Sequence, residues 1–416
     1  MRFTFFRRLG SVLGLAAAYL MLGTTPATAQ KFDGIAQTPP MGWNSWNHFG
    51  CNIDEKLIRS TADAMVANGM RDAGYTNVNL DDCWQGTRDA DGTIQPDAAR
   101  FPSGMKALAD YIHARGLKFG LYSDAGSKTC GGRPGSQGHE YQDAQTYARW
   151  GVDYLKYDWC STGEGAAKRN PQEAYATMRD AIHAAGRPMI LSICEWGDSK
   201  PWLWATSVGH LWRTTGDITN CWDCVVNHGT WFSSGVLAIL DQQSQARAAA
   251  GPGHWNDPDM MEVGNLPTFS ENRAHFTLWA MLAAPLIAGT DVNALKPDIR
   301  AILIDRDVIA IDQDRLGIQG FAWIKRDGLE IWAKPLDAGD WAIAVLNRGS
   351  APRTETIDWP RLDLKDDLSG HDAKLGAMRY RIRNLWTKRD AGETTAPLAV
   401  ALGAHDVALY RLTPTR

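Results

Sequence analysis

In YLKYDWC, residues 154–160, an apolar run of β type ends in charged and aromatic residues. A strand that is only buried would stop at a turn, so these polar residues need an explanation. Seven further short apolar runs with polar, aromatic or small-residue ends recur along the chain: MGWNSW (41–46), NVNLDDCW (77–84), KFGLYSD (118–124), ILSICEW (190–196), HLWRTTGD (210–217), GHWNDPDM (253–260) and PLIAG (285–289).

Helical patterns lie between most of these runs. Residues 57–74, 104–116 and 173–186 each carry apolar residues three to four positions apart and finish on a glycine, a common helix C-cap. Eight strands that alternate with helices over about 280 residues predict a (β/α)8 barrel. The carboxyl ends of the strands form the active face of such barrels, so we expect Asp158 to lie at the mouth.

The pattern changes after about Leu316. Five later segments alternate apolar and polar residues: LEIWAK, WAIAVLN, ETIDW, RYRIRNLW and HDVALYRL. They predict a C-terminal antiparallel β-sandwich domain over residues 318–416, after a barrel over residues 30–317. Because no low-complexity linker separates the two, we expect the domains to pack directly against each other.

Residues 1–29 have the order of a secretory signal peptide. Arginines come first, an apolar run from about Leu9 to Leu22 follows, and small residues precede Gln30. We therefore expect cleavage near Ala29–Gln30 and export to the periplasm or the medium. No later segment has the pattern of a membrane span, so no membrane association is expected.

Composition narrows the class of protein. A formal net charge of −4 gives no basic surface for nucleic acid. The ten histidines form no HExxH motif, so zinc-dependent hydrolysis is not expected, and nothing calls for a metal or cofactor. Eighteen tryptophans are compatible with sugar-ring binding and equally with a large apolar core.

The seven cysteines point to disulfides, because an exported protein matures in an oxidising compartment. An odd number leaves at least one thiol free. The Cys221-x-x-Cys224 spacing also resembles a zinc or redox motif. With no second pair at metal spacing, a local disulfide is the favoured interpretation.

Acidic and aromatic residues dominate the predicted strand ends. Two carboxylates on either side of a glycosidic bond are the usual machinery for its hydrolysis. Each residue also has a structural interpretation: Asp81–Asp82 could cap a helix or bind calcium, and Lys156–Asp158 could be an ion pair. Asp217 could be an N-cap, Trp46 could be core, and the NDPD turn is expected to hold Asp257 against the backbone. Their joint occurrence at successive strand ends favours a common site.

Seven of these motifs resemble the α-galactosidases of glycoside hydrolase family 27: TPPMGWNSWNHFGCNI, NLDDCW, GLYSDAG, LKYDWC, SICEWG, WRTTGDI and WNDPDM. The resemblance runs from about Thr38 to Gly317, and the β-sandwich tail fits the same family. It implies a retaining exo-glycoside hydrolase that removes terminal α-D-galactose from galactosides or oligosaccharides.

The resemblance assigns roles to individual residues. Asp158 corresponds to the nucleophile and Asp217 to the general acid/base. Cys194 resembles the plant-type free thiol beside the sugar 2-hydroxyl, with Trp196 nearby, whereas Gly209 stands where animal members carry a disulfide partner. Two family disulfides are implied, Cys51–Cys83 and Cys130–Cys160. Sugar-contacting positions fall on Trp46, Asp81, Asp82, Tyr122, Lys156, Arg213, Asp259 and Met260.

The assigned roles carry electrostatic expectations. Asp158 must be ionised to attack, so we expect Lys156 to lower its pKa, and Asp217 must begin protonated, so we expect its pKa to be held higher. Retention of configuration calls for a carboxyl separation of about 5–5.5 Å.

Alternatives of three kinds remain, and the first kind keeps the same fold. The first is a β-L-arabinopyranosidase of the same family, or an enzyme acting on α-N-acetylgalactosaminides. The 2-acetamido group of the latter substrates needs a pocket of small residues, and Cys194-Glu195-Trp196 is too bulky for that. A non-catalytic sugar-binding protein would not need the intact Asp158–Asp217 pair. A metal-dependent hydrolase that used Asp81, Asp82 and Asp259 would lack histidine ligands and would lose activity in the presence of a chelator.

Overall fold

The computed structural model describes Met1 and residues 30–415 of the 416-residue chain, so the predicted signal peptide lies outside the described range apart from Met1. Eight parallel strands follow one another in the order β11-β8-β7-β6-β5-β2-β1-β12. A bridge between Met261, just after β11, and Ala288 in β12 closes the sheet into a barrel. The strands are β1 (Met41–Asn44), β2 (Asn77–Leu80), β5 (Lys118–Asp124), β6 (Tyr154–Asp158), β7 (Ile190–Cys194), β8 (Leu211–Arg213), β11 (Trp255–Asp257) and β12 (Leu286–Ala288).

Strand β6 shows why its sequence ends in charges. Side chains alternate between the two faces of a strand, so Leu155 and Tyr157 face the helices and are fully buried. The ring of Tyr157 packs edge-on against Tyr175 in α6, with ring centroids 5.6 Å apart. Lys156 and Asp158 face the other way and line the cavity at the barrel mouth. The polar end of YLKYDWC is therefore displayed toward that cavity.

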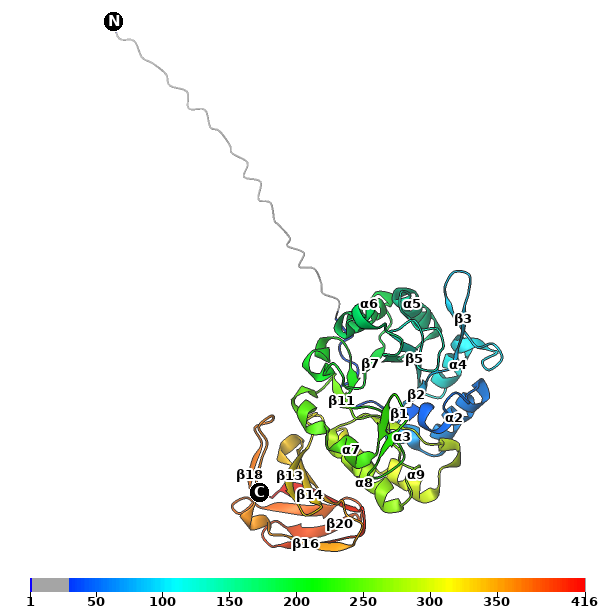
Figure 1. Ribbon diagram of the computed structural model, residues 1–416. Helices are drawn as coiled ribbons and strands as arrows, with labels where there is room; N and C mark the ends of the chain where they lie inside the picture. The colour runs from blue at the N-terminus through cyan, green and yellow to red at the C-terminus, as the bar shows by residue number, and fades with distance from the viewer. Residues whose placement is uncertain (2–29, 416) are drawn as a thin grey trace.

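Helices surround the ring of strands (Figure 1). The pattern of residues 57–74 predicts one helix, but the structure divides it at Asn68–Gly69, because Gly69 adopts a left-handed backbone with φ of 83°. The helices are α1 (Trp46–Phe49), α2 (Glu55–Ala67), α3 (Met70–Ala73), α4 (Gly104–His113), α5 (Glu140–Trp150), α6 (Pro171–Ala185), α7 (Val236–Leu240), α8 (Phe269–Leu282), α9 (Pro297–Leu303) and α10 (Arg306–Asp312).

Two hairpins extend from the loops of the barrel. The first lies between β2 and α4, and the second between β8 and α7. Neither hairpin was predicted from the sequence. The hairpins are β3 (Gln85–Arg88) with β4 (Ile94–Pro96), and β9 (Val225–Asn227) with β10 (Phe232–Ser234).

The C-terminal domain is antiparallel, as predicted, with a six-stranded sheet in the order β13-β14-β15-β22-β19-β20 and two smaller pairs, β16-β21 and β17-β18. A separate apolar core fills it. Its strands are β13 (Phe321–Arg326), β14 (Leu329–Pro335), β15 (Trp341–Asn347), β16 (Arg353–Ile357), β17 (Asp363–Lys365), β18 (Asp372–Lys374), β19 (Tyr380–Asn384), β20 (Arg389–Glu393), β21 (Leu398–Leu402) and β22 (Val407–Pro414).

The two domains pack directly, with α8 against β14, β15 and β22. Lys334 Nζ in β14 donates to the carbonyl of Ala280 at 2.9 Å, and Trp386 Nε1 donates to Thr277 Oγ1 at 3.0 Å. Figure 1 shows the orange and red C-terminal domain beside α8. The predicted boundary at 317/318 falls in the segment between α10 and β13 and stays a prediction.

Three disulfides cross-link the barrel loops: Cys51–Cys83, Cys130–Cys160 and Cys221–Cys224. Cys194 is a free, buried cysteine. In the described part of the chain, none of the helices combines the length and apolar character needed to cross a bilayer.

This pairing predicts the thiol content of the purified protein. Under denaturing, non-reducing conditions a thiol reagent should detect one thiol, that of Cys194, and full reduction should raise the number to all seven. Detection of three or more thiols before reduction, in protein purified without reductant, would contradict the pairing.

Candidate active site

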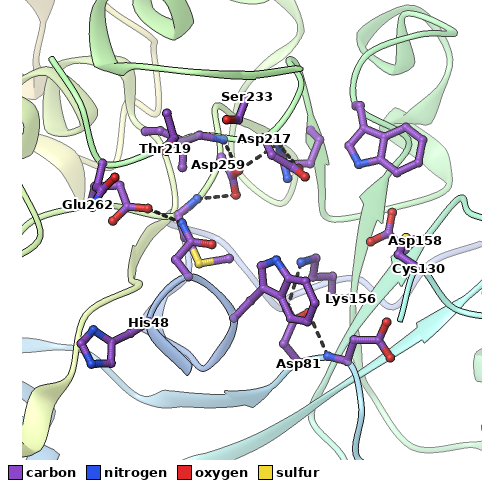
Figure 2. A pocket seen from close by; sticks show the side chains of 18 of the residues that line it. His48, Asp81, Cys130, Lys156, Asp158, Asp217, Thr219, Ser233, Asp259 and Glu262 are labelled. Carbon is purple, nitrogen blue, oxygen red and sulfur yellow. Dashed lines mark hydrogen bonds and ion pairs between the residues drawn. The ribbon is translucent and has the colours of Figure 1, made fainter. Parts of the chain in front are cut away.

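A cavity of about 480 Å³ opens at the carboxyl ends of the barrel strands. Its wall is rich in carboxylates, and Figure 2 shows several of them pointing into the same space. Of the twelve residues predicted for the site, all but Cys194 line it: Trp46, Asp81, Asp82, Tyr122, Lys156, Asp158, Trp196, Arg213, Asp217, Asp259 and Met260.

The register of the sheet brings residues from distant segments to one level. In the pairing of β5 with β6, Tyr122 lies opposite Lys156, and Asp124 lies opposite Asp158. Strand β7 places Cys194 beside Asp158. Because the strands are parallel, their last residues converge on the same rim.

Asp81 stands just after β2, and residues of β1 and β6 hold its carboxylate. Its Oδ2 accepts from Lys156 Nζ at 2.9 Å and from Asn44 Nδ2 at 2.6 Å. Asp82 accepts from the backbone N–H groups of Cys83 at 2.6 Å and Gly131 at 2.7 Å. Burial raises the pKa of Asp82, although these N–H donors oppose the shift. These hydrogen bonds fix the orientation of both carboxylates.

Asp158 is almost completely buried, with 5% of the residue exposed. Its Oδ2 accepts from the hydroxyl of Tyr122 at 3.0 Å, and its Oδ1 accepts from the backbone N–H of Trp159 at 2.9 Å. Both donors stabilise the ionised form and fix the direction of the carboxylate.

Lys156 lowers the pKa of Asp158, as expected, but burial outweighs that effect and the net shift is upward. Burial raises that pKa to about 6, Lys156 opposes the rise, and Asp217 adds to it. The sequence showed the neighbouring lysine but not the extent of desolvation, which is the larger effect here. A pKa of about 6 still leaves Asp158 mostly ionised at neutral pH.

Lys156 remains a cation in spite of its burial. Desolvation works against the ammonium, but the surrounding carboxylates, Asp81 foremost, raise its pKa well above the ordinary value. Lys156 therefore supplies a fixed positive charge between Asp81 and Asp158.

Arg213 organises the opposite wall. Its Nη2 lies 2.9 Å from Asp259 Oδ2 and 3.1 Å from Asp217 Oδ1. Asp259 also accepts from the backbone N–H of Ile218 at 2.9 Å, and burial raises its pKa to about 7 against the opposing charge of Arg213. The Asp217 side chain is 38% exposed, so the two proposed catalytic carboxylates differ sharply in their access to water.

Two further predictions can be placed. The carboxylate of Asp257 accepts from the backbone N–H of Asp259 at 2.9 Å, as expected from the NDPD turn. Cys194 lies behind the wall, where it lines a small separate cavity together with Lys156 and Arg213. Burial raises the pKa of the Cys194 thiol well above its ordinary value, so the thiol stays protonated, and Arg213 Nη1 approaches the sulfur at 3.8 Å.

Sequence reasoning missed part of the cavity wall. Glu262 lies two residues beyond the WNDPDM motif and accepts from Asn47 and Asn265, each at 2.6 Å. Asn47, His48 and Ile218 stand inside quoted motifs, so their motif membership was an available signal. Glu262 and Asn265 lie just beyond a motif and carry no distinctive spacing. The unpredicted lining residues are Asn47, His48, Cys130, Ile218, Thr219, Asn220, His228, Trp231, Ser233, Glu262 and Asn265.

The described residues contain one cluster with metal-ligand chemistry, Asp124, Cys130 and Cys160. Both cysteines belong to the same disulfide, which removes their thiolates as ligands. The cluster therefore does not fit a metal ion.

Comparisons with known proteins agree with this geometry. The family model described as "Alpha galactosidase A" matches residues 38–314, and the model "Alpha galactosidase C-terminal beta sandwich domain" matches residues 326–412. "Alpha-galactosidase A" of Cellvibrio japonicus is 57% identical over 97% of this chain and 98% of its own length. "Alpha-galactosidase" of Cyamopsis tetragonoloba is 45% identical over 92% and 88%.

A solved structure gives the same result. The α-galactosidase of Saccharomyces cerevisiae with raffinose is 32% identical, with a TM-score of 0.84 over 93% of this chain and 100% of that one. The family models together span most of the chain, and the relatives match it nearly end to end. The chain belongs to the α-galactosidases of glycoside hydrolase family 27.

Proposed function

We propose that this α-galactosidase hydrolyses terminal α-galactosides by double displacement, with Asp158 as the nucleophile and Asp217 as the general acid/base. The observation that carries the proposal is the contrast between two carboxylates in one cavity. Asp158 is buried and held by two donors, whereas Asp217 is partly exposed and paired with Arg213. Such a difference in environment separates the roles of two carboxyl groups.

In the first step Asp158 attacks the anomeric carbon while Asp217 gives its proton to the departing oxygen. Tyr122 and the Trp159 N–H hold the attacking carboxylate in one direction. Positioning of this kind replaces the search for a reactive orientation and lowers the entropic part of the barrier. The product of this step is a galactosyl ester of Asp158.

In the second step Asp217, now ionised, takes a proton from water, which attacks the galactosyl ester. The exposed position of Asp217 suits this role, because the water must enter from the open side of the cavity. Two inversions give net retention of configuration. Lys156, Asp81 and Asp82 are proposed to bind the sugar hydroxyls.

The cellular site is part of the proposal. Disulfides persist in oxidising compartments, so three of them favour an exported protein. We propose that residues 1–29 are the signal peptide and that the mature enzyme acts in the periplasm or the medium on galactosides.

Removal of the nucleophile should abolish turnover. Asp158→Asn should lower kcat on every substrate by several orders of magnitude, because no other group can form the ester. Asp217→Ala should keep a fast first step on nitrophenyl galactosides, whose good leaving groups need little acid assistance, but the galactosyl ester should then hydrolyse slowly. Azide, which attacks the ester without a general base, should restore turnover. Asp223→Asn, at an exposed aspartate six residues further on, is the matched control and should be unchanged. Proton NMR should show the α-anomer of galactose first; initial β-anomer would refute double displacement.

The acid limb of the pH profile should report Asp158. Since this group must be ionised in the free enzyme and has a pKa of about 6, kcat/KM should fall as the pH drops through about 6. Lys156 lowers that pKa, so Lys156→Met should move the limb to higher pH, whatever it does to the maximal rate. Thr219→Ser, in the same wall but uncharged, should leave the limb in place. A limb that stays fixed in Lys156→Met, or moves to lower pH, would contradict this electrostatic account.

Asp81 should decide between two sugars that differ only in the exocyclic hydroxymethyl group. The aspartate side chain is short, which leaves room for the hydroxymethyl group. Lys156 and Asn44 hold its Oδ2 in place. We expect kcat/KM for α-D-galactosides to exceed that for β-L-arabinopyranosides by at least about tenfold, because an unmet buried acceptor costs about 1–3 kcal/mol.

The matched variants are Asp81→Glu and Asp82→Glu. Asp81→Glu should narrow or reverse the ratio by filling the space of the hydroxymethyl group. Asp82→Glu should lower kcat/KM for both glycosides by the same factor, because the axial 4-hydroxyl that Asp82 is proposed to bind is common to both sugars. Equal preference in the unchanged enzyme would favour the arabinopyranosidase alternative.

A further inference from the structure

The hairpin of β9 and β10 takes no part in the mechanism, yet its tip belongs to the wall of the active-site cavity. Phe232 pairs with Asn227, and Ser234 pairs with Val225. The backbone N–H of His228 donates to the carbonyl of Trp231 at 2.9 Å, which closes the tip. His228, Trp231 and Ser233 all line the cavity.

Trp231 is unusual in its exposure. It is 48% exposed, although indole rings are normally buried in cores. The imidazole of His228 stacks on it with ring centroids 3.9 Å apart and an interplanar angle of 17°. Ser233 Oγ lies 2.9 Å from His228 Nε2 and fixes that imidazole in turn. One face of the indole is therefore supported by a held ring, while much of its surface stays open to a ligand.

The hairpin is tied to the loop that carries Asp217. The backbone N–H of Ser234 donates to the carbonyl of Asp217 at 2.9 Å, and the N–H of Thr219 donates to the carbonyl of Ser234 at 2.9 Å. The Cys221–Cys224 disulfide lies at the base of the hairpin, where Gly235 N–H donates to the Cys224 carbonyl at 2.8 Å. The position of Trp231 is thus set relative to Asp217 by backbone contacts.

Asp217 gives its proton to the oxygen that joins galactose to the rest of the substrate, so the remainder of the substrate must begin beside Asp217. We propose that Trp231, supported by His228, is the stacking platform for the sugar ring that follows the galactose, and that it selects substrates whose aglycone is a sugar. The apolar face of a pyranose ring covers the exposed indole, and the neighbouring Asn220 supplies an amide for its hydroxyls. This inference rests on the proposed roles of Asp158 and Asp217.

The exposed hairpin could instead pack against a second copy of this chain, because Val225 and Phe232 are also exposed, at 63% and 56%. Those two side chains do not line the cavity, whereas His228 and Trp231 do. The stacked pair therefore faces the path of the substrate, which favours a sugar over a protein surface.

The test compares substrates with and without a sugar aglycone. In Trp231→Ala, kcat/KM for melibiose and raffinose should fall roughly three- to tenfold, the range of one aromatic contact. For α-D-galactosyl fluoride, which has no aglycone ring, the change should stay within about twofold. Inhibition by free galactose should also be unchanged, and Trp231→Phe should recover most of the loss because it restores a flat apolar face.

Phe232→Ala is the matched control, since it removes an adjacent exposed ring that does not line the cavity; it should leave all three substrates unchanged. An equal loss on galactosyl fluoride would show that Trp231 acts through the Asp217 loop and would overturn the proposal. Unchanged kinetics of Trp231→Ala on every substrate would overturn the proposal as well. If light scattering then showed a change in the mass of the particle, the hairpin would be a contact between two copies of the chain. An unmodified enzyme inactive on both melibiose and galactosyl fluoride would instead refute the proposed function.

Discussion

The structure of the site depends on two buried cations among a larger number of buried carboxylates. Lys156 holds Asp81, and Arg213 holds Asp259 and also contacts Asp217. Carboxylates this close together could not all remain ionised in a desolvated cavity, so the cations set which of them carry charge. Removal of one partner from a buried ion pair leaves the other charge uncompensated and costs about 3–5 kcal/mol. The same pairs that make the site reactive are therefore needed to hold its walls in place.

The strand pattern was predictable because it rests on short-range chemistry. Eight apolar runs with distinctive ends identified the eight barrel strands, and alternation identified the C-terminal sheet. Helix boundaries were less predictable: residues 57–74 have one apolar periodicity, but Gly69 takes a left-handed backbone and divides the helix. Periodicity records which face is buried, whereas a single backbone angle decides where a helix stops.

The sequence predicted which residues gather at the site better than it predicted their pKa values. Motif residues gathered as expected, but the pKa of Asp158 rises, because burial depends on the whole barrel and cannot be read from a neighbouring lysine. Cys194 is at the end of β7, as expected, but it lines a small separate cavity and not the main one, with Arg213 Nη1 at 3.8 Å from its sulfur. The hairpin that carries Trp231 had no motif at all, and only the folded chain brings it to the cavity.

The disulfides show how the barrel keeps loop-borne groups in register with strand-borne ones. Cys83 follows Asp82 by one residue, Cys160 follows Asp158 by two, and Cys221 follows Asp217 by four. Each cross-link therefore begins just beyond a carboxylate of the site, at the point where the chain leaves the rigid sheet and would otherwise gain freedom. A catalytic geometry must be held within a fraction of an ångström, and cross-links at these points restrict the loops before the substrate arrives. The part of the cavity proposed to bind galactose is thus built on strand ends, while the part proposed to face the aglycone is built on a loop whose freedom the Cys221–Cys224 bond limits.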